Sequence, residues 1–322
     1  MQSIKEHLGS DWTDFSVGIR EYLGSNIDLL NSTNDNLLAN SGKQVRPLLA
    51  LLLARACSGG TNSNTIRYAI SAELLHNATL LHDDVADQSD ERRGKPTLRA
   101  LMGPEVSVLV GDFWLVCALR AIMDCNVGRD RCLQLFSQTL GSLAEGEMLQ
   151  LQKAASCDTD MDDYLSIIYR KTSSLFVAAT QSAAISVQAS PQVEKAAADF
   201  GKYVGYAFQI KDDILDYDGD SNLGKPLGVD VMEQKITLPL LGAFYNAGAE
   251  KEAMIRAQLR HVDESVRDAV VRFVKENGGI EYAQNILDSY VQKAIDCLDV
   301  LGPSAEKDML VKLANYIAVR NR

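Results

Sequence analysis

Apolar residues recur at three- and four-residue spacing along most of the chain, the period that places them on one face of an α-helix. No segment shows the clear alternation of a half-buried strand. The segments with the helical period are Leu48–Ala56, Ile66–Leu81, Val106–Met123, Leu133–Leu151, Tyr164–Val187, Val193–Ile210, Leu238–Tyr245, Val266–Glu276 and Ile280–Leu301. The pattern therefore predicts an all-α fold.

Helix-breaking residues separate these segments, as expected where one helix ends and the next begins. They include Ser58-Gly59-Gly60, Ser190-Pro191, Gly278-Gly279 and Gly302-Pro303. No Pro/Ser-rich linker or low-complexity tract divides the chain, so we predict a single-domain helical bundle over residues 1–322. Residues 1–40 and 303–322 show the weakest pattern.

Two five-residue words of the form Asp-Asp-x-x-Asp nearly repeat each other, and each ends an apolar helical segment. They are Asp83-Asp84-Val85-Ala86-Asp87 and Asp212-Asp213-Ile214-Leu215-Asp216. On a helix, positions i, i+1 and i+4 turn toward one side, so three carboxylates there repel one another. Divalent cations remove this cost, and Mg²⁺ binds carboxylate oxygens together with phosphate oxygens. A solvated acidic face or an Asp-rich turn is an alternative for a single word, but two words favour a metal site.

Composition narrows the classes of function. A net charge of −11 argues against nucleic acid as a partner. Hydrophobic residues make up 46% of the chain, which is ample for a core, but no long uncharged apolar run predicts an integral membrane segment. The N-terminus lacks the pattern of a signal peptide and the six cysteines form no CxxC pair, so we expect reduced thiols and a cytoplasmic location.

Basic residues accompany the acidic words, as a phosphate site requires. Arg92 and Arg93 follow the first word, and Lys225 follows the second. Arg offers a forked donor for phosphate oxygens and Lys a compact charge. The other candidates are Lys43, Arg46, Lys171 and Lys235. Any one of these side chains, taken singly, is also compatible with an ordinary solvated surface residue.

Short motifs follow one another in order from about residue 40 to residue 240. They are Gly42-Lys43-Gln44-Val45-Arg46-Pro47, Leu75-His76, His82-Asp83-Asp84-x2-Asp87, Arg92-Arg93-Gly94-x-Pro96-Thr97, Gly111-Asp112, Gly146-Glu147-x2-Gln150, Lys171-Thr172, Gln209-x2-Asp212-Asp213-x2-Asp216, Gly224-Lys225-Pro226 and Lys235-x-Thr237-Leu238-Pro239. Together they resemble the trans-isoprenyl diphosphate synthases, or polyprenyl synthetases. One departure is Gln44, which stands where the family often has a second basic residue.

The resemblance implies the all-helical isoprenoid synthase fold with a central cavity, and a head-to-tail condensation that uses Mg²⁺. In this reaction an allylic diphosphate, farnesyl or geranylgeranyl diphosphate, ionises to a carbocation. The double bond of isopentenyl diphosphate attacks it, and the departing pyrophosphate takes up the released proton. Clustered Mg²⁺ ions neutralise the pyrophosphate and make it a better leaving group.

The resemblance also suggests roles for residues of this chain. Metal ligands are Asp83, Asp87 and Asp212, with Asp84, Asp213 and Asp216 binding directly or through water. The allylic diphosphate contacts Arg92, Lys171, Lys225 and Lys235, and isopentenyl diphosphate contacts Lys43, Arg46, His76 and Arg93. Thr172 and Gln209 place oxygen dipoles near the carbocation. The alternative for His76 is a satisfied core histidine.

Small residues before Asp83 bear on the length of the product. Thr79 and Ala78 lie four and five positions back, about 6–7.5 Å along a helix axis. In the family a bulky aromatic residue there acts as a floor, so its absence predicts an open tunnel and a product of about 30 to 50 carbons, near 40. Ordinary helix packing of Ala78 stays an alternative, with a floor from Leu75 or from residues of Ala118–Phe136.

Other classes of protein compete with this interpretation. A class I terpene cyclase shares the first Asp word but needs no second diphosphate site, and a non-catalytic subunit is expected to have lost an Asp word. A short-chain synthase making farnesyl or geranylgeranyl diphosphate is the strongest alternative. By resemblance we expect a homodimer, a product used for quinone side chains, and transient membrane contact during its release.

Overall fold

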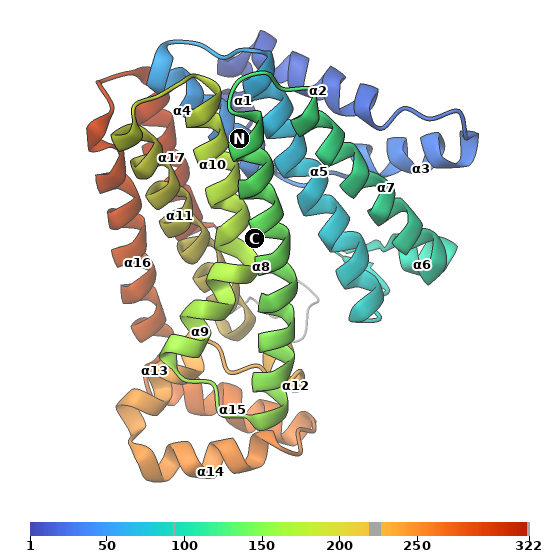
Figure 1. The fold of residues 1–322 in the computed structure, drawn as a ribbon. Coiled ribbons are helices and arrows are strands. Elements are labelled where there is room, and N and C mark those ends of the chain that lie inside the picture. Colours follow the sequence, from blue (N-terminus) through green and yellow to red (C-terminus); the bar gives the residue numbers. More distant parts are fainter. Residues whose placement is uncertain (93, 219–226, 321–322) are drawn as a thin grey trace. The chain divides into compact units, whose positions relative to one another are not determined.

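The computed structural model describes residues 1–92, 94–218 and 227–320, and helices dominate this part of the chain (Figure 1). The α-helices are α1 Gln2–Leu8, α2 Ser10–Tyr22, α3 Asp28–Ala39, α4 Val45–Ser58, α5 Ser63–Ala86, α6 Leu98–Met102, α7 Pro104–Met123, α8 Arg129–Ser156, α9 Met161–Ile168, α10 Ser174–Ser186, α11 Pro191–Asp218, α12 Val229–Met232, α13 Leu238–Ala247, α14 Ala249–Leu259, α15 Glu264–Glu276, α16 Gly279–Cys297 and α17 Ala305–Val319. A π-helical turn, η1 Tyr169–Ser173, joins α9 to α10, and a 3₁₀ turn, η3 Leu298–Val300, follows α16. The predicted all-α class is confirmed.

The chain groups into two compact units, each assembled from segments that are distant in sequence. Unit 1 comprises Met1–Phe136, Ala178–Ala197 and Val300–Leu310. Unit 2 comprises Ser137–Val177, Ala198–Asp299 and Val311–Arg322. Helices α8, α10, α11 and α17 contribute residues to both units. The predicted single domain stays a prediction.

Helix α5 forms the centre of unit 1 and packs against α2, α4 and α7. Its start is fixed by a capping box, in which the Asn62 side chain accepts from the Thr65 backbone N–H and the Thr65 hydroxyl accepts from that of Asn62. Its middle is almost entirely buried, and its last turn carries the first Asp word. A buried helix thus delivers three carboxylates to one end of the unit.

Polar contacts attach the N-terminal helices to the rest of unit 1. Arg55, at the end of α4, donates to the carbonyls of His7 and Leu8 at 3.0 and 2.6 Å and pairs with Asp11 at 2.7 Å. The two carbonyls belong to the last turn of α1, where a cation is favourable. On α7, the Trp114 indole N–H donates to the Asn34 side chain of α3 at 2.7 Å.

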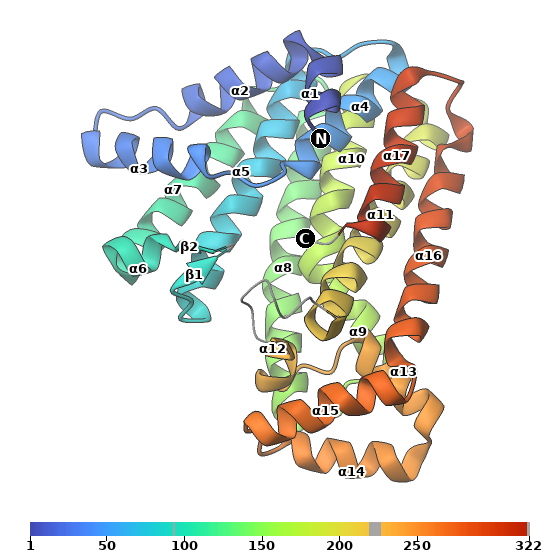
Figure 2. The ribbon, with the colours of Figure 1, turned by 180° about the vertical axis from the view of Figure 1, so that it is seen from behind.

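A short hairpin follows the first Asp word (Figure 2). Strands β1 Glu91–Arg92 and β2 Lys95–Pro96 pair antiparallel, with Arg92 opposite Lys95. No sequence pattern predicts these strands, because two residues are too few for an alternating pattern to appear.

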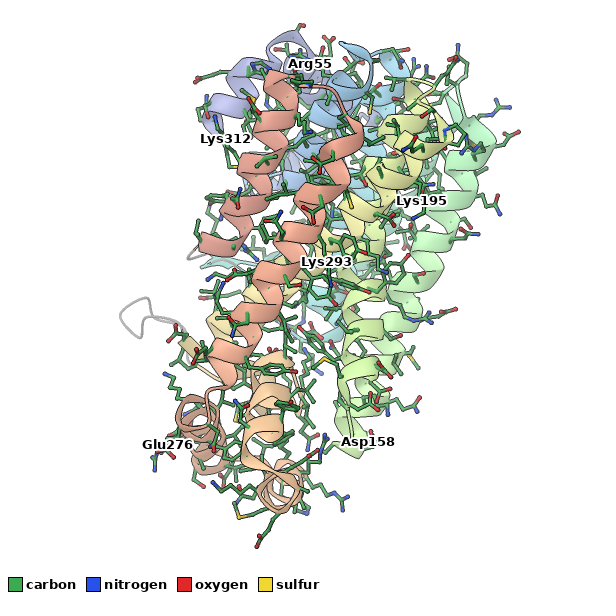
Figure 3. All side chains as sticks on the ribbon, turned by 90° about the vertical axis from the view of Figure 1, so that its left-hand side faces the viewer. Arg55, Asp158, Lys195, Glu276, Lys293 and Lys312 are labelled. Atoms are coloured by element: carbon green, nitrogen blue, oxygen red, sulfur yellow. The ribbon has the colours of Figure 1, made fainter. Side chains whose placement is uncertain are left out.

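Unit 2 packs α13 against α16, α15, α14 and α9, and it carries the second Asp word on α11. Aromatic rings fill the contact between α11 and α16. Tyr290 lies 4.9 Å from Tyr206 and 6.0 Å from Tyr203, measured between ring centroids. The Lys293 ammonium, on the residue labelled in Figure 3, lies 4.9 Å from the Tyr290 ring centroid.

Helix α7 is long and apolar enough to cross a membrane by length and composition alone. Its most apolar window is 44% buried, and core helices of proteins outside membranes meet the same criterion. The finding is weak evidence for a membrane span.

Candidate active site

The first Asp word divides its side chains between solvent and the interior of unit 1. Asp87 is exposed and Asp83 half-buried, whereas Asp84 is only 4% exposed. The Arg92 guanidinium of β1 donates through Nε to Asp84 Oδ1 at 2.7 Å. From the sequence we predict Asp84 at a metal ion and Arg92 at a diphosphate. The structure places these two side chains in contact with each other instead.

The Gly111-Asp112 motif of α7 lies beside the first word. His82 Nε2 is 3.2 Å from Asp112 Oδ1. A Cβ atom at Gly111 would lie 2.4 Å from that same nitrogen, so glycine leaves room for the imidazole in this position next to Asp83. The motif is therefore explained by packing around His82.

The predicted isopentenyl diphosphate residues of unit 1 lie on α5 and around the start of α4, two helices that pack together. Lys43 is exposed, Arg46 buried and His76 half-buried. Gln44 stands where the family often has a second basic residue, and its backbone is left-handed (φ 54°). Its side-chain oxygen accepts a hydrogen bond from the Lys5 ammonium at 3.1 Å. Lys5 thus brings a cation from α1 to this position. Arg93 lies outside the described residues.

The second Asp word, in unit 2, gives each carboxylate a different partner. Asp212 Oδ1 accepts from Arg320 of the C-terminal segment at 2.7 Å. Asp213 is 3% exposed and accepts from the Tyr164 hydroxyl at 2.6 Å and from Gln209 at 2.9 Å. Asp216 accepts from two backbone N–H groups at the start of α12, those of Val229 and Asp230, both at 3.0 Å. Asp216 therefore fixes the segment that leads to Lys235.

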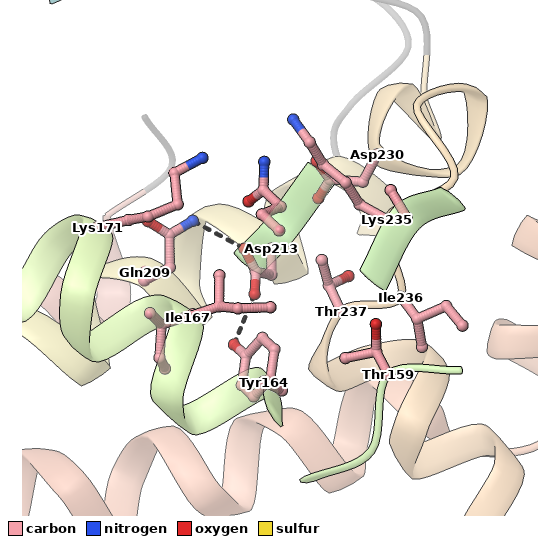
Figure 4. Close-up of a pocket in the computed structure, with 13 residues that line it drawn as sticks. Thr159, Tyr164, Ile167, Lys171, Gln209, Asp213, Asp230, Lys235, Ile236 and Thr237 are labelled. Atoms are coloured by element: carbon pink, nitrogen blue, oxygen red, sulfur yellow. Dashed lines mark hydrogen bonds between the residues drawn. The ribbon is translucent and has the colours of Figure 1, made fainter. Parts of the chain in front are cut away.

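A cavity of about 140 Å³ opens among these residues of unit 2 (Figure 4). Its polar lining comes from two lysines, two aspartates and several neutral donors and acceptors. These are Lys171, Lys235, Asp213, Asp230, Gln150, Gln209, Tyr164, Thr159 and Thr237. Ionic contacts hold both lysines, with Lys171 Nζ 2.5 Å from Glu147 Oε2 and Lys235 paired with Glu233. Lys225 lies outside the described residues.

Burial makes the ionised form of three carboxylates in unit 2 unfavourable. Burial raises the pKa of Asp213 to about 7, while hydrogen bonds from Tyr164 and Gln209 oppose the rise and the charge of Asp212 adds to it. Burial also raises the pKa of Asp216, and it raises the pKa of Asp230 further. A hard divalent cation nearby offsets the negative charge of such carboxylates, so the surroundings of the second Asp word fit Mg²⁺. Among the described residues, no three acidic, His or Cys side chains already form a compact metal-binding group.

A π-helical turn carries Lys171 and Thr172, and two glycines allow its close packing. A Cβ atom at Gly146 of α8 would lie 2.6 Å from the Arg170 Cβ, and one at Gly205 of α11 would lie 2.4 Å from the Ser173 Cα. Single π-helical turns occur frequently at functional sites. The Thr172 hydroxyl, 8% exposed at the residue level, donates to the Gln209 side chain at 2.7 Å.

Sequence reasoning missed two members of this site, Tyr164 and Asp230. Tyr164 lies seven residues, or two helical turns, before Lys171, and this spacing was the available signal. Asp230 follows Gly228-Val229 on α12, a helix too short for a periodic pattern to reveal.

Residues 27–276 match the family model described as polyprenyl synthetase. The chain belongs to this family. It is 37% identical to octaprenyl diphosphate synthase of Escherichia coli (strain K12), a match that covers 100% of this chain and 99% of that protein. It is also 37% identical to an all-trans-nonaprenyl-diphosphate synthase (geranyl-diphosphate specific) of Rhodobacter capsulatus, with 97% and 95% covered.

Solved structures of the family share the fold. A decaprenyl diphosphate synthase from Rhodobacter capsulatus matches with a TM-score of 0.92 and 32% identity, over 100% of this chain and 99% of that one. A polyprenyl synthase from Caulobacter crescentus CB15, complexed with calcium and isoprenyl diphosphate, matches with a TM-score of 0.90 and 31% identity, over 99% and 97%. The predicted family and isoprenoid synthase fold are confirmed, and the polyprenyl synthetase is a trans-prenyl diphosphate synthase, hence a transferase.

Proposed function

We propose that this enzyme condenses isopentenyl diphosphate with farnesyl or geranylgeranyl diphosphate, in the presence of Mg²⁺, to make a long all-trans polyprenyl diphosphate. The product has about 30 to 50 carbons, since small residues where a floor would stand leave room for a long chain. The observation that carries the proposal is Ala78, a small residue 1% exposed in the interior of α5, five positions before Asp83. Relatives named for octaprenyl and nonaprenyl products support it.

Mg²⁺, when bound, supplies positive charge that stabilises the departing pyrophosphate. Asp83 and Asp87 are proposed Mg²⁺ ligands in unit 1, and Asp212 is a proposed Mg²⁺ ligand in unit 2. Lys171 and Lys235 line the cavity of unit 2 and are proposed to bind diphosphate oxygens once they leave Glu147 and Glu233. Thr172 and Gln209 then direct oxygen dipoles toward the carbocation.

Incubating the purified chain alone with Mg²⁺, farnesyl diphosphate and labelled isopentenyl diphosphate tests the proposal. We expect products well beyond geranylgeranyl diphosphate. Absence of elongation contradicts the activity, or shows that a second protein is needed, as the name "heptaprenyl diphosphate synthase component 2" of a 34% identical Geobacillus stearothermophilus relative suggests for that enzyme. Products that stop at geranylgeranyl diphosphate favour the short-chain alternative. A 32% identical relative named short chain isoprenyl diphosphate synthase supports that alternative.

Ala78→Phe is expected to shorten the products, because an aromatic ring there obstructs the growing chain. Ala78→Val adds less volume and is expected to shorten them less. Chain lengths are read by chromatography of the dephosphorylated products, and thermal unfolding checks that each variant folds. An unchanged distribution in a folded Ala78→Phe variant removes Ala78 from the tunnel wall and points to Leu75 or to residues of Ala118–Phe136.

We further propose a cytoplasmic homodimer that contacts the membrane only while the product leaves, with quinone side chains as the use of the product. The support is the resemblance described above and the greasy nature of a long prenyl chain.

A further inference from the structure

Asp213 of the second Asp word is buried and joins two hydrogen bonds. Asp213 Oδ2 accepts from the Tyr164 hydroxyl at 2.6 Å, and Oδ1 accepts from Gln209 Nε2 at 2.9 Å. Gln209 Oε1 in turn accepts from the Thr172 hydroxyl at 2.7 Å. The chain of hydrogen bonds therefore runs from Tyr164 through Asp213 and Gln209 to Thr172, entirely within unit 2. Figure 4 shows its first two bonds, from Tyr164 to Asp213 and from Gln209 to Asp213.

The chemistry of these groups sets the direction of every hydrogen bond. In the structure the Gln209 NH₂ faces Asp213, the arrangement that the ionised carboxylate requires because it only accepts. The amide oxygen then faces Thr172, and the Thr172 hydroxyl must donate its single proton to that oxygen. The Thr172 lone pairs are therefore directed away from Gln209, available to a positive charge.

The positions of these residues favour a supporting role for Asp213. It is 3% exposed, less than the half-buried Asp212 next to it, and each of its oxygens already accepts a hydrogen bond. Tyr164, 2% exposed, follows a capping box between Asp160 and Asp163 that fixes the start of α9. The Tyr164 end of the hydrogen-bond chain is thus held in a fixed position.

We propose that Asp213 and Tyr164 are positioning residues that fix the orientation of the Gln209 amide and the Thr172 hydroxyl, and that Asp213 is not a metal ligand. Asp212 accepts from Arg320, and both oxygens of Asp216 accept from the backbone of α12, so neither carboxylate belongs to this chain of hydrogen bonds. The proposal rests on the proposed condensation for its kinetic test but not for its metal-binding test.

The first experiment counts bound metal without turnover. Mn²⁺ binding in the presence of inorganic pyrophosphate is measured for the wild type, Asp213→Asn, Tyr164→Phe and Asp212→Asn. We expect the Asp213→Asn and Tyr164→Phe variants to bind as many Mn²⁺ ions as the wild type, and Asp212→Asn to bind one fewer. A lost ion in Asp213→Asn overturns the proposal, whatever reaction the enzyme catalyses.

The second experiment separates kcat from KM. Tyr164→Phe and Asp213→Asn are each expected to lower kcat about 10- to 100-fold, the usual effect of losing a group that orients an active-site residue, while KM for the allylic diphosphate changes little. Both act through one hydrogen-bond chain, so the double variant is expected to be no slower than Asp213→Asn. Additive losses, or a wild-type kcat in Tyr164→Phe, contradict the proposal.

Conservative variants distinguish orientation from packing. Thr172→Ser keeps the hydroxyl and is expected to retain most of kcat, whereas Thr172→Val is expected to lose about as much as Tyr164→Phe. Tyr203→Phe removes a hydroxyl from α11 outside the chain and serves as the matched control. If Tyr164→Phe fails to fold, Asp213→Asn and the Thr172 pair still decide the question: equal kcat in Thr172→Ser and Thr172→Val overturns it.

Discussion

Asp83→Asn is expected to lower kcat by about 10³-fold, because an amide carries no charge to hold Mg²⁺ against the leaving diphosphate. The interaction of a metal with such a leaving group is worth several kcal/mol, and each 1.36 kcal/mol is a factor of ten in rate. Asp83 and Asp87 lie one turn apart at the end of α5 and are more exposed than Asp84 between them. These two side chains are therefore the accessible pair of the first word.

The measurement is kcat at increasing Mg²⁺ concentration, with thermal unfolding to confirm the fold. Asp90→Asn is the matched control, since Asp90 is an exposed carboxylate close by that pairs with Arg99 at 2.6 Å. We expect it to retain near-wild-type activity. If Asp83→Asn stays within about tenfold of the wild type at saturating Mg²⁺, well short of the several kcal/mol expected, Asp83 is not a metal ligand.

Much of the fold was readable from the sequence, because helices with a buried face repeat their apolar residues. The N-terminal helices are harder to predict, because α1 buries only Ile4 and Leu8 and α2 only Phe15 and Ile19, and polar contacts add to their attachment. Arg55 binds the last carbonyls of α1, and Asn34 accepts from Trp114. No periodic pattern encodes such pairs, because each partner comes from a distant part of the chain.

The Asp words were visible as motifs, but the different roles of their members were not. Helical geometry turns positions i, i+1 and i+4 to one side and makes them appear equivalent. The structure separates them through neighbours from other elements, Arg92 for Asp84 and Tyr164 for Asp213. Burial of the second aspartate in both words is a tertiary effect that the five-residue motif does not contain.

The apolar pattern predicts uninterrupted helix over Tyr164–Val187, and the structure places the π-helical turn Tyr169–Ser173 inside it. A single wider turn changes the register by about one residue, which is within the tolerance of a three- or four-residue pattern. The glycines that pack on this turn, Gly146 and Gly205, lie on α8 and α11. The sequence positions of these glycines do not predict that they contact the π-helical turn.

Gly205→Ala is expected to destabilise the protein by about 2–3 kcal/mol and to lower kcat strongly. The added Cβ would lie 2.4 Å from the Ser173 Cα, a backbone atom that no side-chain rotation can move away. Either α11 or the π-helical turn must shift, and Thr172, the neighbour of Ser173, would move with the turn. Loss of activity should therefore accompany loss of stability, even where the variant is fully folded.

Urea unfolding and kcat at a temperature well below the transition measure the two effects separately. Gly141→Ala is the control, since nothing lies within 4 Å of its added Cβ on α8. Alanine suits a helix better than glycine, so this variant is expected to gain about 0.5–1 kcal/mol and keep its activity. Gly146→Ala is also expected to be destabilising, because its added Cβ would lie 2.6 Å from the Arg170 Cβ, an atom that no side-chain rotation moves, and 3.1 Å from the Lys171 backbone nitrogen. Wild-type stability and kcat in Gly205→Ala would show that the turn has room to move without affecting the reaction.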